Sequence, residues 1–366
     1  MEATLEIRND AESTLRELFA TLLEQNICHA LMLPVQLSAG GGVAPALVRD
    51  RDRLADARPL APVLPVSEAT TAARLTRGDR QGVLGLLMHP CQLRAFVELV
   101  KLQQAERENV LLIGIDCPGT YELTDYVKLV REMSEPGEDL LPELRQGQPQ
   151  PHTGYDFRAA CQVCEWPFPA QADLRVRIVG VGSKAELVLQ GRSELLEALG
   201  FTPAADSAGL SEAEETLLRE RRTRRDEVFA AFSAGVHDMA GLLEYFATCI
   251  RCLNCMGACP LCYCKECIFR TDTFQHRPAD YERWLERKGA VRLPADTLLF
   301  HLTRLNHMVT SCVGCGLCDS ACPSDLPVAR VFRTVGQRVQ GLFDYVPGRD
   351  IAEPIPIATF REDELE

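Results

Sequence analysis

In the first half of the chain, continuous apolar runs alternate with stretches whose apolar residues recur at helical spacing. The runs 83–88 and 109–115 are almost wholly apolar, which is typical of strands buried on both faces. A stretch with apolar residues at helical spacing follows each run, at 91–104 and at 120–133. This order predicts a βαβ unit with parallel strands.

Weaker patterns predict elements on both sides of this unit. We expect an amphipathic helix over 10–25 and a short strand over 27–33. A glycine-rich turn at 38–43 is expected to lead into a short helix, and 50–80 shows no clear period. The other predictions are a long loop over 135–154, strands at 174–181 and 185–190, a short helix ending at 199, a helical segment over 211–246 and a last helix within 323–341.

One cysteine pattern occurs twice in the second half of the chain. It is C-x2-C-x2-C-x3-C-P, at 249–260 and again at 312–323. Bacterial ferredoxins bind two cubane iron–sulfur clusters with this pattern, and the fourth cysteine of each run ligates the other cluster. One cluster is then expected on Cys249, Cys252, Cys255 and Cys322, and the other on Cys312, Cys315, Cys318 and Cys259. A pair of zinc ribbons shares the C-x2-C spacing, but the repeated third and fourth cysteines with proline favour clusters.

A third group of cysteines is scattered along the chain. Cys91 and Cys117 each follow one of the predicted parallel strands, so both should lie at the carboxyl edge of the sheet. Cys161 and Cys164 add a C-x2-C pair. These four could hold a third cubane cluster, and the alternative is that they are buried structural cysteines.

The fold class that follows is an α/β domain with parallel strands plus a C-terminal dicluster bacterial-ferredoxin-like domain. The chain has 366 residues, enough for two or three domains. The expected boundaries are an α/β domain over 1–210, a helical connector over 211–246, a cysteine-rich domain over 247–345 with an insertion at 260–311, and an acidic tail over 346–366.

The scattered cysteines lie in a recognisable sequence context. The residues of this context are Pro90-Cys91-Gln92, Cys117, the pair Cys161/Cys164, Ala172-Asp173-Leu174 and the strand 178–182. In these residues the first half resembles the beta subunits of deazaflavin-dependent hydrogenases and formate dehydrogenases, although His89 stands where that family has a small residue. The resemblance covers roughly residues 25–200 and implies that the third group holds a core 4Fe–4S cluster, giving three in all.

The same resemblance implies a flavin, FAD, beside that core cluster. The turn Gly40-Gly41-Gly42-Val43 looks like the family's glycine-rich segment near the flavin, and Lys184 could neutralise a flavin phosphate, although a lysine at a strand edge is usually just solvated. The chain has no G-x-G-x-x-G fingerprint that would support a dinucleotide independently.

Composition limits the possible partners. The formal net charge of −13 argues against nucleic-acid binding. The arginine-rich run 219–225 is interleaved with acidic residues and is interpreted as a solvated helix, in preference to a partner-binding patch. No run of about eighteen apolar residues predicts a membrane span. The acidic N-terminus lacks the pattern of a secretory signal, so the expected location is the cytoplasm.

Three further cysteines, Cys262, Cys264 and Cys267, follow the first motif directly. They could be spare thiols, alternative ligands, or a zinc site completed by His276, His301 or His307. The interpretation preferred at this stage is that they form no fourth centre. Cys28 is expected to be a buried structural residue.

Three functional hypotheses remain. The first is an oxidoreductase subunit that passes electrons through three clusters and FAD, between a catalytic partner and a soluble carrier. That partner would be a formate dehydrogenase, a hydrogenase or a heterodisulfide-reductase-type subunit. The second is a flavin-free adaptor that only connects redox subunits, and the third is a non-redox structural metal protein.

Overall fold

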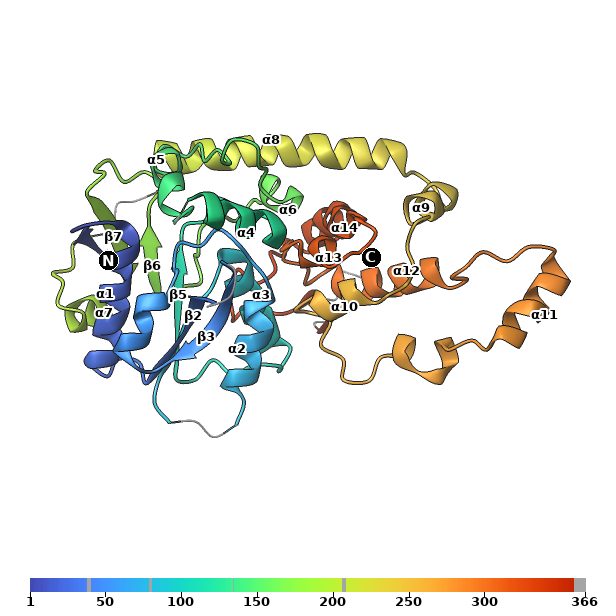
Figure 1. The fold of residues 1–366 in the computed structure, drawn as a ribbon, viewed down its shortest axis with the longest axis horizontal. Helices are drawn as coiled ribbons and strands as arrows, with labels where there is room; N and C mark the ends of the chain where they lie inside the picture. The colour runs from blue at the N-terminus through green and yellow to red at the C-terminus, as the bar shows by residue number, and fades with distance from the viewer. Residues whose placement is uncertain (38–40, 79–80, 134, 206–208, 359–366) are drawn as a thin grey trace.

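The computed structural model describes residues 1–37, 41–78, 81–133, 135–205 and 209–358. A sheet with helices around it makes up the first half of the chain, and a part with short helices and loops carries most of the cysteines (Figure 1). The long helix α8 (Glu212–Gly235) runs along one side of the molecule, from the sheet to the cysteine-rich part. No helix in the described ranges is both long and apolar enough for a membrane span.

The described strands form one seven-stranded mixed sheet with the order β1-β7-β6-β5-β4-β2-β3. Its centre is parallel, because β2 pairs with β4, β4 with β5, and β5 with β6, in each case in parallel. The outer strands pair antiparallel. The strands are β1 (Glu2–Glu6), β2 (Ala30–Gln36), β3 (Val43–Val48), β4 (Leu84–Leu87), β5 (Val110–Ile115), β6 (Leu174–Arg177) and β7 (Glu186–Gly191).

Two groups of helices accompany the sheet and the cysteine-rich part. With the sheet lie α1 (Ala11–Glu24), α2 (Glu68–Thr76), α3 (Pro90–Lys101), α4 (Leu123–Glu132), α5 (Leu141–Arg145), α6 (Ala159–Gln162) and α7 (Ser193–Ala198). The later helices are α9 (Met239–Tyr245), α10 (Asn254–Ala258), α11 (Pro278–Lys288), α12 (Thr297–Met308), α13 (Leu317–Ser320) and α14 (Val328–Leu342). Short 3-10 helices occur at η1 (Arg51–Asp56), η2 (Glu138–Leu140), η3 (Ile268–Arg270), η4 (Asp272–Phe274) and η5 (Pro356–Ala358).

The predicted βαβ unit is confirmed in β4, α3, β5 and α4. The helix expected over 10–25 is α1, and its N-cap Asp10 accepts a hydrogen bond from the backbone N–H of Ser13. Ser211 caps α8 in the same way, within a capping box that includes Glu214. These elements were predictable because their own residues show the hydrophobic period or the N-capping residue of the element.

Other predictions were wrong at the edges of the sheet. The segment after the glycine-rich turn is the strand β3 and not a helix, because all of its residues pair with β2. Its Pro45 is tolerated since β3 is an edge strand. The helix α2 lies in the stretch 50–80 that showed no period, α5 lies in the expected loop 135–154, and β1 was not foreseen.

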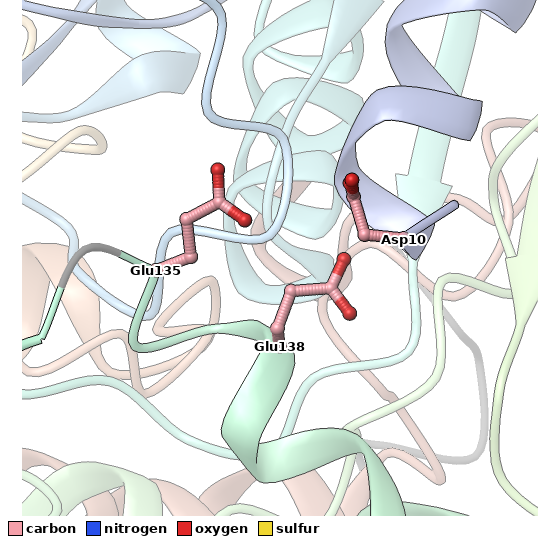
Figure 2. A group of neighbouring side chains, drawn as sticks. All are labelled: Asp10, Glu135 and Glu138. Carbon is pink, nitrogen blue, oxygen red and sulfur yellow. The ribbon is translucent and has the colours of Figure 1, made fainter.

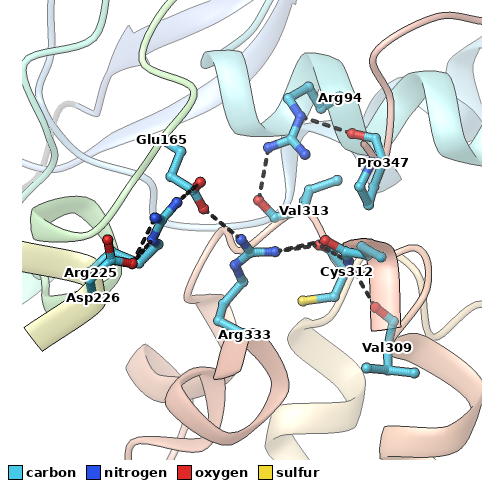
Figure 3. A network of polar contacts seen from close by, with 10 residues as sticks. Arg94, Glu165, Arg225, Asp226, Val309, Cys312, Val313, Arg333 and Pro347 are labelled. Atoms are coloured by element: carbon cyan, nitrogen blue, oxygen red, sulfur yellow. Dashed lines mark hydrogen bonds and ion pairs between the residues drawn. The ribbon is translucent and has the colours of Figure 1, made fainter. Parts of the chain in front are cut away.

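The two parts of the molecule are joined by buried polar contacts (Figure 3). Glu165 pairs with Arg225 of α8 and with Arg333 of α14, the latter at 3.0 Å. Arg94 of α3 donates from Nε to the carbonyl of Pro347 at 2.8 Å and from Nη1 to the carbonyl of Val313 at 3.2 Å. The sheet, α8 and the cysteine-rich part therefore share one network.

The residues after α14 pack against α3. The Tyr345 hydroxyl donates to Glu98 Oε1 at 2.5 Å, and the N–H of Gly348 donates to the same oxygen at 2.8 Å. A Cβ on Gly348, which has φ +69°, would stand 2.2 Å from the carbonyl oxygen of Arg94. The start of the predicted acidic tail is thus fixed to the sheet part, and 359–366 lie outside the described residues.

Candidate metal centres

The four cysteines expected to hold the first ferredoxin-type cluster line one small cavity. Cys249, Cys252 and Cys255 come from the loop and first turn around α10, and Cys322 comes from the segment after α13. Burial raises the pKa of Cys255 to about 11; Arg304 opposes this shift, and the thiols of Cys249, Cys252 and Cys322 contribute to it. Segments about seventy residues apart are therefore brought together at one point.

In the second ferredoxin-type group, none of the four cysteines is exposed, whereas Cys252 of the first group is. Burial raises the pKa of Cys315 to about 12, and Cys259 and Cys312 act in the same direction. Burial also raises the pKa of Cys318 well above its usual range, and Asp319, Cys315 and Cys259 add to that shift. The cysteine that ends the first motif thus lies among the three of the second motif.

The third group assembles at the carboxyl edge of the parallel strands. Cys91 begins α3 just after β4, and Cys117 follows β5, so strand order places them side by side. Burial raises the pKa of Cys91 well above its usual range, with the thiols of Cys315, Cys164, Cys117 and Cys161 as further causes. The Thr120 hydroxyl lies 3.2 Å from Cys161 Sγ. All four predicted residues come together, and Cys315 of the second group adjoins them.

Groups of buried thiols are suited to metal binding. A thiolate is costly to form in a low-dielectric surrounding, and costlier beside other thiolates. A bound metal ion or cluster compensates that charge and releases the thiol protons. The chemistry of the donor sets therefore fits iron–sulfur cores.

Two buried arginines lie between these groups. Arg158 is 5% exposed, and its Nη2 donates to the carbonyl of Cys315 at 2.9 Å. Arg304 is 3% exposed, and its Nη1 donates to Cys255 Sγ at 3.1 Å. Its guanidinium also interacts with the thiols of Cys259 and Cys318. Buried cations at both junctions would offset the negative charge of thiolate-ligated clusters.

The position of Arg158 requires a close approach between the second motif and the sheet part. Gly316 stands between Cys315 and Cys318 with φ +70°. A Cβ there would lie 2.3 Å from Cβ of Ala160 and 3.0 Å from Nη2 of Arg158. Only glycine fits this conformation and this contact without a shift of the backbone.

His301 lies beside the first group. Its Nε2 is 3.3 Å from Cys249 Sγ, and its ring stacks on Phe246 with 3.8 Å between the centroids. Burial and the nearby Arg304 lower the pKa of His301 to about 3, so the imidazole is neutral. Neither the role of His301 nor the roles of Arg158 and Arg304 were predicted, because nothing local marks these residues as neighbours of cysteines.

The arginine-rich run of α8 was only partly interpreted correctly. Arg221 is buried, and its Nη2 donates to the carbonyl of Pro118 at 2.6 Å, which fixes the loop that carries Cys117. Arg225 pairs with Glu165, next to Cys164. The prediction of a solvated helix is wrong for these two residues and fits Arg222, which is exposed.

The residues predicted to hold FAD do not converge. Gly40 lies outside the described residues, and Gly41, Gly42 and Val43 belong to the β2–β3 hairpin. Lys184 is exposed and precedes β7. Strands β6, β5, β4 and β2 lie between β7 and β3. Lys184 and the glycine-rich turn are therefore near opposite lateral edges of the sheet.

Two cavities flank the sheet-edge group. One, lined by Cys117 and by Leu60 and Leu141 among others, holds about 50 Å³ and is too small for a flavin. The other, of about 450 Å³, is lined by Pro118, Cys161, Arg221 and Arg224. Its size is within the range of cofactor sites. Its charged lining residues are two arginines, which suit a pyrophosphate, and two carboxylates, Asp156 and Glu220.

A group of carboxylates at the start of α1 is explained by capping (Figure 2). Asp10, Glu135 and Glu138 have oxygens within 4.8 Å of one another. Asp10 is the N-cap of α1 and accepts from the N–H of Ser13. Glu138 accepts from the N–H of Glu12 at 2.5 Å, and Glu135 forms an ion pair with Arg16 at 3.3 Å. Each carboxylate therefore has a partner within the protein, and we assign no metal to the group.

Comparison with known proteins identifies relatives of both parts of the chain. A family model described as a 4Fe-4S dicluster domain matches residues 245–326. The F420-dependent formate dehydrogenase subunit beta of Methanocaldococcus jannaschii is 27% identical over 299 residues, which cover 72% of this chain and 73% of the relative. The F420-dependent formate dehydrogenase 1 subunit beta of Methanococcus maripaludis is 28% identical over 299 residues, with the same coverage.

Solved structures also align with the chain. One of them is a chain of the F420-reducing NiFe hydrogenase complex from Methanosarcina barkeri, with 13% sequence identity and a TM-score of 0.46, over 65% of this chain and 94% of that one. The expected fold class is confirmed by the mixed sheet with its parallel centre and by the dicluster match. The resemblance seen in the sequence is likewise confirmed: the chain is a homologue of the beta subunits of F420-dependent formate dehydrogenases and carries a 4Fe–4S dicluster domain.

Proposed function

We propose that this oxidoreductase subunit passes electrons through three 4Fe–4S clusters. The observation that carries the proposal is the continuity of the three cysteine groups. Cys315 adjoins Cys91 on one side, and Arg304 bridges Cys255 and Cys259 on the other. Clusters held at these positions would form an unbroken line from the sheet edge to the first motif.

Each cluster is proposed to have the four ligands that the sequence predicts. The sheet-edge cluster takes Cys91, Cys117, Cys161 and Cys164; one ferredoxin-type cluster takes Cys249, Cys252, Cys255 and Cys322; the other takes Cys312, Cys315, Cys318 and Cys259. The protein's contribution is to bury these groups and to place cations beside them. Burial, charge and hydrogen bonds to sulfur set the potential of each cluster.

FAD is proposed to lie in the cavity of about 450 Å³ beside Cys161. Arg221 and Arg224 would hold its pyrophosphate. Of the residues predicted from the sequence, Gly41, Gly42 and Val43 lie at the opposite edge of the sheet from Lys184, and Gly40 lies outside the described residues. A bound flavin supplies exchange between a two-electron carrier and one-electron clusters. The residues of this chain bind it, and they keep the sheet-edge thiols next to it.

The proposed partner is a catalytic subunit in a hetero-oligomer, of the formate dehydrogenase, hydrogenase or heterodisulfide-reductase type. The relatives are themselves named as subunits of F420-dependent formate dehydrogenases, and F420, a deazaflavin, is a soluble carrier that the proposal extends to this chain. The domain limits proposed are those expected from the sequence, since α8 and α9 connect the two parts and the dicluster match begins at 245.

Anaerobic purification with iron, acid-labile sulfide and flavin assays tests the proposal. The expected result is at least about twelve irons and twelve sulfides per chain, together with one FAD. Clusters without flavin would support the adaptor hypothesis, which the small cavity at Cys117 favours. Zinc in place of iron would overturn the redox function altogether.

A further inference from the structure

The segment after Pro260 holds three cysteines that the three proposed clusters do not use. Cys262, Cys264 and Cys267 stand within six residues, between the first motif and η3. The chain between them forms neither helix nor strand, so their side chains are not forced onto alternating faces. All three line one cavity of about 810 Å³.

This cavity lies between the two parts of the molecule. Helices α2 and α3 contribute residues from the sheet side, and α12 contributes residues from the cysteine-rich side. Cys262 and Cys267 pack against the apolar cluster that contains Cys255 and Phe300. Cys264 is exposed. The three thiols thus lead from the interior next to the ferredoxin-type groups out to the surface.

Cys259 lines the same cavity and connects it to the second ferredoxin-type group. The N–H of Cys262 donates to the carbonyl of Cys259 at 3.2 Å. A centre held by the triplet would therefore adjoin the cluster that has Cys259 as a ligand, one turn of chain away.

The walls of the cavity are basic, although the chain carries a net charge of −13. Its charged lining residues include one carboxylate, Glu266, and five cations: Arg74, Arg77, Lys265, Arg270 and Arg304. The buried Nε of Arg304 has no hydrogen-bond partner among the described residues. A buried donor without a partner is costly, so the cavity is suited to an anionic occupant that accepts hydrogen bonds.

We propose that Cys262, Cys264 and Cys267 bind a fourth iron–sulfur cluster in this cavity. Three thiolates are soft donors of the kind that bind iron–sulfur cores and zinc. The space is far larger than a single ion requires, and the occupant must be anionic enough to face five cations. His307, which lies one helical turn after Arg304, lines the cavity and is the proposed ligand of the remaining iron.

A fourth cluster would add a branch to the proposed line of three clusters. The second ferredoxin-type cluster would then have three neighbours: the sheet-edge cluster through Cys315, the first motif's cluster through Arg304, and the fourth cluster through Cys259. Because Cys264 is exposed, the branch ends at the surface. This inference goes beyond the proposed function, which needs only the other three groups.

The test compares variants of the full chain, purified without oxygen together with its partner subunits. In one variant Cys262, Cys264 and Cys267 are all replaced by alanine, and in another Cys264→Ser alone is made. Cys28→Ala, which removes a buried cysteine outside every group, is the matched control. Iron, acid-labile sulfide and zinc are counted per chain, and the reduced proteins are examined by electron paramagnetic resonance.

The triple variant should lose about four irons and four sulfides relative to wild type and to Cys28→Ala, with zinc unchanged. Cys264→Ser changes an exposed side chain, so folding is retained, and it should lose or alter one set of resonance signals while the others persist. Unchanged iron and sulfide in both variants would overturn the fourth cluster, as would a loss of zinc in place of iron. The proposed function fails separately, if wild type lacks the iron of the other three groups.

Discussion

The sheet-edge cysteines and the two ferredoxin motifs bring thiols together on very different foundations. Cys91 and Cys117 extend from strands of a sheet whose core includes Leu15, Phe19 and Ile113. Around the first motif, by contrast, one small apolar cluster has four buried members: Cys255, Met256, Phe269 and Phe300. The sheet-edge group is carried by a fold with an apolar core of its own, whereas most of the motif cysteines pack against an apolar cluster that α14 shares with α3, β4 and β5. We infer that metal contributes much more to folding in the second region than in the first.

The strongest way to break this comparison is to remove the metal. Chelation of iron under reducing conditions should unfold the segment 247–326, because its thiols lose the cores that hold them together. The central strands of the sheet should stay folded. Hydrogen exchange read by mass spectrometry would show near-complete loss of protection in α10, α12 and α13, with β4 and β5 still protected. Equal loss in both regions would contradict the comparison.

Replacement of Gly316 by valine tests the contact between the two regions. A side chain there would collide with Ala160 and Arg158 and would impose an unfavourable φ. We expect a destabilisation of roughly 3 kcal/mol, measured as a lower thermal unfolding midpoint of the cysteine-rich part. Gly257→Ala is the matched control, since the nearest atom to its new Cβ is 3.8 Å away, at the flexible end of Arg270. A similar midpoint for both variants would show that the close approach is unimportant.

Arg304→Gln tests whether buried cations set the cluster potentials. Removal of a positive charge next to Cys255 and Cys259 disfavours the reduced, more negative state of a cluster. The midpoint potential of at least one ferredoxin-type cluster should fall by about 60 mV or more, equivalent to about 1.4 kcal/mol for one electron. Potentiometric titration followed by electron paramagnetic resonance measures the shift. Arg222→Gln, an exposed change on α8, should leave every potential in place.

A smaller effect is expected in the sheet part, where stability depends on a carboxyl group instead of a metal. Burial raises the pKa of Glu12 to about 8, with a further contribution from Glu135. The folded state therefore favours the protonated acid, and its stabilisation is lost as pH rises from about 4.5 through about 8. Glu12→Gln should raise stability by about 1 kcal/mol at pH 8.5 and by almost nothing at pH 4.5. An equal gain at both pH values would contradict this assignment.

The same two regions explain what could be predicted from the sequence. The spacing of the cysteines from Cys249 to Cys259 predicts iron–sulfur cluster binding from only eleven residues. Local hydrophobic patterns likewise predict β4, α3 and β5. The electrostatic interaction between the thiols of Cys315 and Cys91 joins positions 224 residues apart, and no local pattern encodes it. Strand order brings Cys91 and Cys117 together, so that pair was predictable once the parallel strands were recognised.

Residues that act through tertiary contacts were not predictable in this way. Arg158, Arg304 and His301 have neighbours that look ordinary in the sequence, and only folding places them against thiols. The strand β3 was mistaken for a helix because pairing with β2, and not its own composition, decides its conformation. The same holds for Gly41 and Lys184, whose separation follows from the order of the strands.

The central claim is that the sheet-edge group holds a cluster of its own, in line with the ferredoxin-type clusters. The most direct test is the iron content of Cys117→Ser, purified anaerobically beside wild type and Cys28→Ala. The account predicts a loss of about four irons per chain, while the resonance signals of both ferredoxin-type clusters persist. Iron content equal to that of wild type would show that Cys117 is not a ligand and would contradict the account.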